Sequence, residues 1–213
     1  MSLPVIILGA GGHSKVLIDT LQVSSAVIVG IVDADFALLG AKILGVHVLG
    51  GDEVVNEFSI SEIHLVNGLG SVGLQSKRQK LFEKFKSAGY KFATIIHPSV
   101  AVSSDVVLGE GVQVMAGAVI QPGCQIGINN IINTRVSVDH DCVIGDHVHI
   151  APGATLSGGV TIGAYSHIGT GATIIQGISI GSGCLIAAGA VVTKDVADGA
   201  RVCGVPAREF FSR

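Results

Sequence analysis

A histidine between two aspartates is the pattern in this chain best suited to proton transfer. His140 follows Asp139 and precedes Asp141. An imidazole titrates near pH 6.5, so at neutral pH it is mostly unprotonated and can accept a proton from an attacking group. A flanking carboxylate can bind the second ring nitrogen and hold the tautomer. The triplet therefore predicts a general base at His140, with a solvated polar turn as the alternative interpretation.

A glycine-rich turn near the N-terminus could bind an anion. Residues 9–12 read Gly-Ala-Gly-Gly, follow an apolar run and open a helical pattern, so that backbone amides and a helix N-terminus face the turn. The next apolar run ends at Asp33, where a carboxylate reaches a ribose or a base. Ser14 stands where a dinucleotide fingerprint has its third glycine, which argues against NAD. A nucleotide site is predicted, with a ligand-free tight turn as the alternative. Its candidate residues are Gly11, Gly12, His13 and Asp33.

The elements that position this turn belong to a small α/β domain. We expect extended segments at residues 4–8, 26–32, 43–49 and 62–66, and helices after the glycine turn and at residues 77–88. Short buried strands that alternate with helices are typical of a parallel sheet. The sequence therefore predicts a Rossmann-like domain at residues 1–94.

From residue 95 the chain follows a period of six. An aliphatic residue occupies every sixth position from Ile96 to Val192, seventeen in succession, and a small or β-branched residue stands four places after most of them. Neither an α-helix nor a simple strand has this period, whereas a coiled parallel ribbon does. Residues 95–213 are predicted to form a β-helix with both sets of side chains inside, its last coil closing at Val191–Asp195. Asn130 and Ser166 are polar exceptions that need hydrogen-bond partners within the coil.

Composition excludes several classes of protein. Glycine provides 30 of the 213 residues and aromatic residues only 4%, which does not fit a β-sandwich or a helix bundle. The net charge of −3 gives no basic stripe for nucleic acid. No apolar run reaches the ~20 residues of a membrane span, and no signal-peptide pattern is present. We expect a cytoplasmic protein.

The four cysteines are interpreted as core residues rather than as disulfides or metal ligands. Cys124, Cys142 and Cys184 occupy the inward small position of the repeat, where a thiol packs as a compact hydrophobic group. The side chains of Cys124 and Cys142 should run parallel, which disfavours a bridge between them. Cys203 has no assignment.

Five segments together resemble one family along essentially the whole chain. They are residues 9–16 (GAGGHSKV), the strand that ends at Asp33, Ile95–Ala101, Ile132–Gly159 and Gly204–Arg208. They are similar to the bacterial nucleotide-sugar N-acetyltransferases of the hexapeptide-repeat family and to sialic acid O-acetyltransferases. The resemblance implies a left-handed β-helix with three hexads per coil, a nucleotide sugar on the N-terminal domain, acetyl-CoA between subunits and a homotrimer without a metal.

The same resemblance implies roles for individual residues. His140 would deprotonate the sugar amine, Asp141 would bind its ring, and Asn133 would lie beside the sugar. Because His140 and His149 are nine residues apart, about half a coil, they could converge only across a subunit boundary. Each of the other positions also has an ordinary structural interpretation. An asparagine or a glycine can serve only to form a tight corner of the coil, and basic residues in a tail are often solvated. The residues expected beside acetyl-CoA are His149, Gly158, His167, Lys194, Val205, Pro206 and Arg208.

Several functions remain open from the sequence. The resemblance favours an N-acetyltransferase acting on a nucleotide-linked amino sugar of the 4-amino-4,6-dideoxy type, although a histidine base would also serve the hydroxyl acceptor of a sugar O-acetyltransferase. A zinc hydratase of the γ carbonic anhydrase type needs three ligands, and only His149 and His167 are suitably placed. A non-catalytic scaffold would bind nucleotide without acetyl transfer. We expect Asp33 and the loop Asn67–Ser71 to select the nucleotide.

Overall fold

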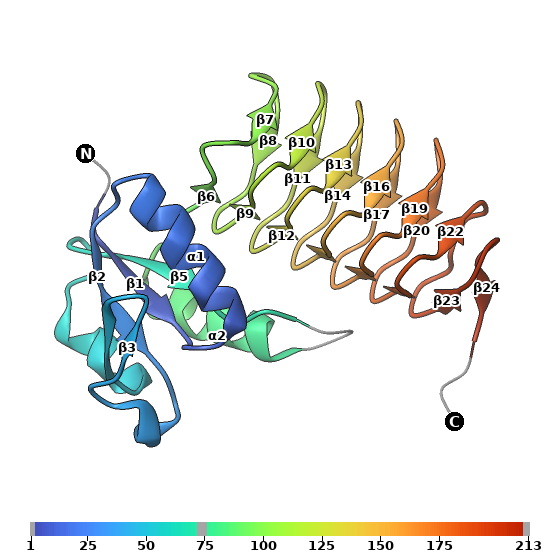
Figure 1. The fold of residues 1–213 in the computed structure, drawn as a ribbon. Coiled ribbons are helices and arrows are strands. Elements are labelled where there is room, and N and C mark those ends of the chain that lie inside the picture. The colour runs from blue at the N-terminus through green and yellow to red at the C-terminus, as the bar shows by residue number, and fades with distance from the viewer. Residues whose placement is uncertain (1–2, 72–75, 211–213) are drawn as a thin grey trace. The chain divides into compact units, whose positions relative to one another are not determined.

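The computed structural model describes residues 3–71 and 76–210, which form two compact units. The first extends to Pro98 and the second begins at Ser99 (Figure 1). We expected the boundary between the two domains after residue 94, and that boundary remains a prediction. Within the described ranges, no helix is long and apolar enough to span a membrane.

The first unit is a small α/β fold around one sheet. The strands follow the order β3-β4-β2-β1-β5, and all neighbours are parallel except β3 and β4. Its elements are β1 (Val5–Leu8), α1 (Gly12–Val23), β2 (Ile28–Val32), β3 (Lys42–Ile43), β4 (Val46–Gly50), β5 (His64–Asn67), α2 (Ser76–Ser87) and β6 (Ile95–Ile96), with 3-10 turns η1 (Phe36–Leu38) and η2 (Asp52–Glu57).

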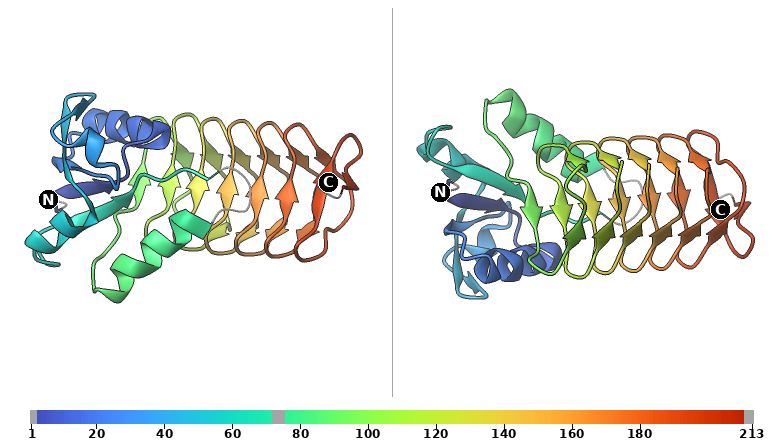
Figure 2. Two further views of the ribbon diagram at one scale, coloured as in Figure 1. Left: turned by 90° about the horizontal axis from the view of Figure 1, so that it is seen from below. Right: turned by 90° about the horizontal axis from the view of Figure 1, so that it is seen from above.

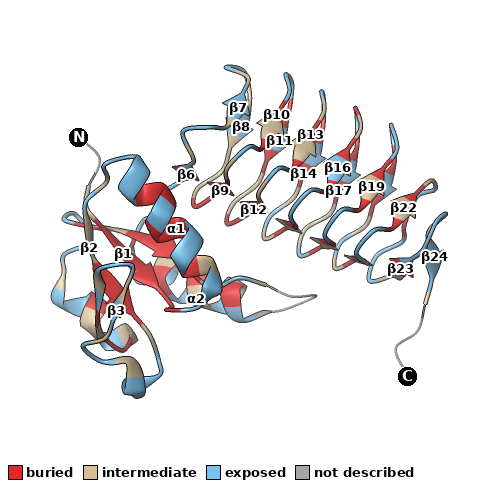
Figure 3. Cartoon of the chain, viewed as in Figure 1, coloured by how far each residue is buried: buried red, intermediate tan, exposed pale blue. Residues whose placement is uncertain are grey.

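Strand β1, which lies between β2 and β5, is buried on both faces. All four residues of β1 are buried, as expected for an uninterrupted apolar run in a parallel sheet (Figure 3). Helices α1 and α2 lie on opposite sides of the sheet (Figure 2). Leu17 and Leu21 of α1 and Phe82 and Phe85 of α2 are buried, which gives each helix one apolar face.

The segment 43–49 is not the single extended piece that we expected. Leu44 and Gly45 both have positive φ, 47° and 85°, and form a two-residue turn between the antiparallel strands β3 and β4. Positive φ at both central residues suits the twist of a hairpin. The expectation missed this turn because leucine is an uncommon residue in the left-handed region.

The second unit is a parallel β-helix in which each coil gives one short strand to each of three sheets (Figures 1 and 2). Neighbouring strands pair residues eighteen apart, as in Ser137 with Thr155. The first sheet contains β7 (Ala101–Val102), β10 (Val119–Ile120), β13 (Ser137–Val138), β16 (Thr155–Leu156), β19 (Thr173–Ile174) and β22 (Val191–Val192). The second contains β8 (Val107–Leu108), β11 (Gln125–Ile126), β14 (Val143–Ile144), β17 (Thr161–Ile162) and β20 (Ser179–Ile180). In this unit the third contains β9 (Gln113–Val114), β12 (Ile131–Ile132), β15 (His149–Ile150), β18 (His167–Ile168), β21 (Leu185–Ile186), β23 (Arg201–Cys203) and β24 (Arg208–Glu209).

The period-six aliphatic residues form the core of the β-helix, with an exception at its beginning. They are buried at every position from Val114 to Val192. Ile96 and Val102, in contrast, are 39% and 38% exposed, and Leu108 is only partly buried. A β-helix encloses an inward residue between the coils before and after it, and these three residues begin the repeat. The pairing of Val102 with Ile120 keeps the expected register at this end, but the first positions of the repeat are left partly uncovered.

Along most of the β-helix, the fourth place of the hexad has a left-handed backbone. From Gly111 to Gly189, φ at this place lies between 53° and 76°. Glycine, which has no Cβ to clash, occupies nine of these corners. The other residues at this place are Asn129, Arg135, Asp141, His147 and Tyr165.

The polar exceptions at the inward small position have the partners that burial demands. Asn130 donates to the carbonyls of Gly127 and Gly145 and accepts from the Val148 amide. Ser166 donates to the carbonyl of Gly181 at 2.8 Å. Both expectations are confirmed. These side chains join one coil to the next and fix the coil spacing.

The C-terminal end differs from the expected closure at Val191–Asp195. Val196 forms a parallel bridge with Ile180, and β23 pairs in parallel with β21, so the coil continues to Cys203. Strand β24 then pairs antiparallel with β23. The pairing Leu185–Arg201 spans sixteen residues, because this coil is two residues shorter than the others. That deletion breaks the period in the sequence without ending the structure.

Candidate active site

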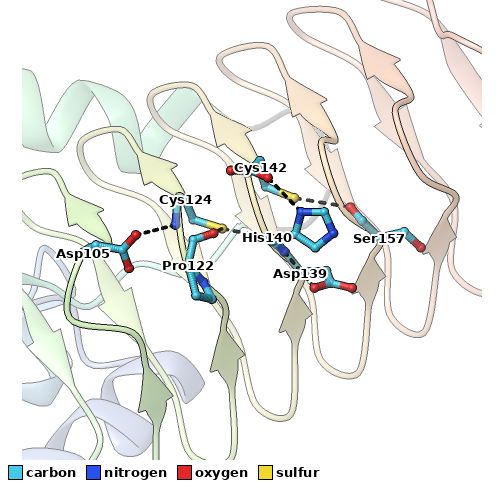
Figure 4. A network of polar contacts seen from close by, with 9 residues as sticks. Asp105, Pro122, Cys124, Asp139, His140, Cys142 and Ser157 are labelled. Atoms are coloured by element: carbon cyan, nitrogen blue, oxygen red, sulfur yellow. Dashed lines mark hydrogen bonds and ion pairs between the residues drawn. The ribbon is translucent and has the colours of Figure 1, made fainter.

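His140 projects from a corner of the β-helix between β13 and β14 (Figure 4). Its side chain is 54% exposed, so it is not a core histidine. The ring Nδ1 lies 2.8 Å from Oδ2 of Asp141, the contact expected from the sequence. Asp141 occupies a left-handed corner with φ 59°, which turns its carboxylate back toward the preceding residue. Nε2 is left as the nitrogen available to a substrate.

Both flanking carboxylates favour the protonated ring. The hydrogen bond to Asp141 is the main cause that raises the pKa of His140 above its ordinary value of 6.5, and the negative charge of Asp139 adds to it. Asp139 also accepts the backbone N–H of His140 at 2.8 Å. One carboxylate therefore orients the ring while the other fixes the backbone that carries it.

Gly158, on the next coil, lies directly against this ring. A Cβ atom at Gly158 would lie 2.5 Å from Nε2 of His140, so only glycine leaves the ring in place. At the same place in other hexads, the backbone N–H donates a hydrogen bond to a side chain. The N–H of Ile128 donates to Asp146, and that of Thr134 donates to Asn133. Within the described chain, the N–H of Gly158 has no such partner. The imidazole thus lies against a residue whose backbone amide has no partner in the described ranges.

Two buried thiols fix the backbone at this place. The Sγ of Cys124 lies 3.1 Å from the carbonyl oxygen of Asp139, and the Sγ of Cys142 lies 3.3 Å from that of Ser157 (Figure 4). These carbonyls belong to the residues just before His140 and Gly158. Burial raises the pKa of Cys142 to about 11, so it remains a thiol. The inward cysteines therefore act as hydrogen-bond donors as well as apolar filling.

All four cysteines are free thiols, and three of them are buried. Cys184 follows the same pattern as the other two inward cysteines, with its Sγ 3.0 Å from the carbonyl oxygen of Ala197. Cys203 is exposed near the C-terminus. No set of three or more His, Cys, Asp or Glu side chains in the described ranges is arranged to hold a metal ion.

A second polar cluster lies on the third sheet. His149 and His167 are neighbours in β15 and β18, with ring centroids 4.9 Å apart in an edge-to-face arrangement. Nδ2 of Asn133 lies 3.1 Å from Nε2 of His149, so Nε2 accepts and the proton of a neutral ring is on Nδ1. Burial lowers the pKa of His167. The structure joins Asn133 to His149, a contact that the sequence analysis did not foresee, although their spacing of sixteen is close to one coil.

The C-terminal candidates separate into two groups. Lys194 and Arg208 line the same cavity of about 240 Å³. Val205 is 73% exposed and Pro206, which follows a cis peptide bond, is also exposed. Neither of these two residues lines that cavity.

The glycine turn of the first unit is open toward solvent. Gly11 is the N-cap of α1, Gly12 begins the helix, and no atom would contact a Cβ at either position. His13 lies on the first turn, as expected. The carboxylate of Asp33 accepts the N–H of Ala10 at 2.6 Å and that of Asp35 at 2.8 Å. Asp33 therefore braces the turn, a role that the sequence analysis did not assign to it.

Two buried residues that the sequence analysis missed hold the neighbouring loop. The hydroxyl of Ser14 lies 2.5 Å from the carbonyl oxygen of Gly9 and 3.0 Å from that of Gly68. Nη1 of Arg78 donates to the carbonyls of Asn67 and Leu69, both at 2.7 Å. Burial lowers the pKa of Arg78 to about 9. A lone arginine on an apolar helix face was the only signal available for the second of these contacts.

Comparison with known proteins assigns both halves of the chain. The PglD N-terminal domain model matches residues 4–85, and the bacterial transferase hexapeptide model matches residues 123–158 and 159–194. PerB from Caulobacter crescentus, solved with CoA and GDP-perosamine, is 40% identical, with 98% of this chain and 97% of that chain covered and a TM-score of 0.89. The chain belongs to the hexapeptide-repeat family of nucleotide-sugar N-acetyltransferases.

Further members of the family agree with this assignment. The acetyltransferase domain of PglB from Neisseria gonorrhoeae FA1090, solved with acetyl coenzyme A, is 36% identical with a TM-score of 0.90, covering 99% of this chain and 100% of that chain. WeeI from Acinetobacter baumannii AYE is 28% identical with a TM-score of 0.86, covering 98% and 100%. None of the curated proteins matches the chain. As a family member the protein is an acetyltransferase, and the expected Rossmann-like domain followed by a left-handed β-helix is confirmed.

Proposed function

We propose that this protein transfers the acetyl group of acetyl-CoA to the amine of a nucleotide-linked 4-amino-4,6-dideoxy sugar in bacterial glycan biosynthesis. The observation that carries the proposal is His140, which is held by Asp141 at 2.8 Å and lies against Gly158. A base beside an oxyanion donor is what acyl transfer to an amine requires. Members of the family solved with GDP-perosamine and CoA support this choice of co-substrates.

The chemistry follows from these positions. The neutral amine attacks the thioester carbonyl while Nε2 of His140 takes the proton that the nitrogen loses. Asp141 stabilises the resulting imidazolium through Nδ1. The Gly158 N–H donates to the oxygen that becomes negative in the tetrahedral intermediate. Collapse of the intermediate breaks the carbon–sulfur bond, and the CoA thiolate leaves and takes up the proton from the imidazolium.

The binding residues are assigned in the same proposal. Gly11, Gly12 and His13 bind the phosphates of the nucleotide through open amides and the start of α1, and Asp33 holds this turn in shape. Asn133 lies beside the sugar, whereas acetyl-CoA lies along His149 and His167 and ends near the C-terminus. Lys194 and Arg208 bind its phosphates, and Val205 and Pro206 line its adenine end.

The site is completed by a second copy of the chain. His140 lies at the corner between β13 and β14, whereas His149 lies on the third sheet, so one chain presents them on different faces. Residues on different faces of one prism meet only when a neighbouring prism packs against it. We therefore propose a homotrimer with active sites between subunits, in which a separated monomer is inactive.

An acceptor panel tests the function. Release of CoA from acetyl-CoA should occur with one of the UDP- or GDP-linked 4-amino sugars, and the product should carry the acetyl group on nitrogen. Preference for free sialic acid in the same assay would assign an O-acetyltransferase instead. Nucleotide binding without acetyl transfer to any acceptor would indicate a scaffold, and a stoichiometric zinc content would contradict the proposed mechanism.

A further inference from the structure

The carboxylate of Asp141 lies against a glycine of the preceding coil. Gly123 stands one coil before Asp141, since the strands that follow these two residues, β11 and β14, are paired. Both residues have a left-handed φ, 76° and 59°. A Cβ atom at Gly123 would overlap Oδ1 of Asp141 and would lie 3.4 Å from its Cγ. Oδ1 therefore faces Gly123, while Oδ2 contacts Nδ1 of His140 at 2.8 Å.

The repeat by itself does not require glycine at position 123. At another corner of the β-helix the fourth place carries side chains on three successive coils, at Asn129, His147 and Tyr165. Nδ2 of Asn129 lies 2.9 Å from Nδ1 of His147, and the rings of His147 and Tyr165 are stacked. A side chain on one coil is thus compatible with a side chain on the next. At Gly123 the space is taken by the carboxylate of Asp141.

The backbone around Gly123 is held by hydrogen bonds. Asp105 points toward this corner (Figure 4), and its Oδ2 accepts the N–H of Gly123 at 2.9 Å. The other oxygen of Asp105 accepts from the hydroxyl of Ser103 at 2.7 Å. The carbonyl of Pro122 accepts the backbone N–H of Asp141 at 3.0 Å. Because an aspartate carboxylate turns about two side-chain bonds, a side chain added at Gly123 would displace the carboxylate rather than this backbone.

The direction of this carboxylate matters because it orients the proposed base. Asp139 and Asp141 are the charged groups that raise the pKa of His140, and the hydrogen bond to Asp141 is the largest cause. Asp139 contacts the backbone N–H of His140 rather than its ring. We propose that Gly123 is a positioning residue for acetyl transfer, because the space left by its missing side chain lets Asp141 place Oδ2 against Nδ1 of His140. This inference rests on the proposed function.

Titration of the His140 ring tests the inference without depending on turnover. The histidine ring signals of the full-length protein are followed by NMR between about pH 5 and pH 9, and that of His140 is assigned by its loss in His140→Gln. The variants are Gly123→Ala, Asp141→Asn and the two changes together. Gly177→Ala is the matched control, because Gly177 lies at the same corner with φ 72° and a Cβ there would meet no atom. Both alanines adopt the same strained backbone, so the two thermal midpoints should fall by similar amounts.

Gly123→Ala should lower the pKa of His140 toward its value in Asp141→Asn, because the displaced carboxylate no longer holds the proton on Nδ1. The plateau of kcat/KM should fall at least about tenfold, and its acidic limb should move to lower pH. Gly177→Ala should leave the pKa and the rate unchanged. When Asp141 is already asparagine, Gly123→Ala should have little further effect on the pKa, since no charge remains to be displaced.

An unchanged pKa of His140 in Gly123→Ala, an equal fall in Gly177→Ala, or a full additional fall in the double variant would each overturn the inference. If Gly123→Ala does not fold, Gly123→Asn takes its place, since asparagine tolerates the left-handed backbone and its Cβ occupies the same space. A lowered pKa in Gly123→Ala combined with full activity of His140→Ala would contradict the proposed function instead, because the ring would be oriented without serving as the base.

Discussion

The imidazole of His140 occupies the space that a side chain on Gly158 would need, with Nε2 and Cε1 each 2.5 Å from that Cβ position. Gly158 does not have a left-handed φ, so alanine fits its backbone and would act only by displacing the ring. We predict that Gly158→Ala lowers kcat at least about 100-fold, because a displacement of about 1 Å is enough for such a loss. The thermal midpoint should change little. Thr170→Ala, an exposed third-place residue on another corner, is the control, and full activity of Gly158→Ala would contradict the site geometry.

The pH dependence of the reaction should report the contact between His140 and Asp141. Because this hydrogen bond raises the pKa of His140, the rate should fall as the pH drops through a value above 6.5, where the base becomes protonated. Asp141→Asn removes the carboxylate and lowers that pKa, so the acidic limb of kcat/KM moves to lower pH. The plateau should also fall, since the ring tautomer is no longer held.

Asp139→Asn provides the comparison for this pH profile. Asp139 contributes negative charge but does not contact the ring. The acidic limb of Asp139→Asn should therefore move less than that of Asp141→Asn. An acidic limb that stays in place, or moves upward, in Asp141→Asn would show that another group controls the rate.

Thiol labelling should separate the cysteines by burial. Cys124, Cys142 and Cys184 are buried, and burial raises the pKa of each thiol, so little thiolate exists at neutral pH. Only Cys203 is exposed. A thiol reagent should therefore modify one cysteine in the native protein and four in denaturant. Rapid labelling of two or more native thiols would contradict the closed core.

The period of the sequence was sufficient to predict much of this structure. An aliphatic residue at every sixth position between Val114 and Val192 requires an inward position that repeats every six residues. Neither an α-helix nor a simple strand has this period. The same period placed His140 outward, and the adjacent aspartates made its partner foreseeable. What the pattern could not give was the end of the repeat, where Ile96 and Val102 lack a preceding coil.

Contacts that depend on backbone conformation were beyond the sequence. The Leu44–Gly45 turn and the left-handed Arg135 are visible only as φ values, because leucine and arginine do not by themselves indicate a turn. The brace between Asp33 and Ala10 joins segments far apart in the chain, and a carboxylate at a strand end was equally compatible with a ligand.

The packing of Gly68 against Ser14 should be intolerant of a single methyl group. A Cβ at Gly68 would overlap the Ser14 hydroxyl and lie 2.8 Å from the carbonyl oxygen of Leu8. Overpacking of this kind costs about 1–3 kcal/mol, so Gly68→Ala should lower the free energy of unfolding of the first unit by that amount. Chemical denaturation measures it. Gly12→Ala, where a Cβ meets nothing, is the matched control, and equal stability of the two variants would contradict the tight loop.

The rate of acetyl transfer by His140→Ala tests the central claim most directly. With wild-type and variant protein at saturating acetyl-CoA and acceptor, loss of the base should lower the rate constant by about 10²- to 10⁴-fold. The affinity for acetyl-CoA and the thermal midpoint should remain near their wild-type values, because the ring is exposed and lies outside the core. A variant that retains most of the wild-type rate would show that His140 is not the base.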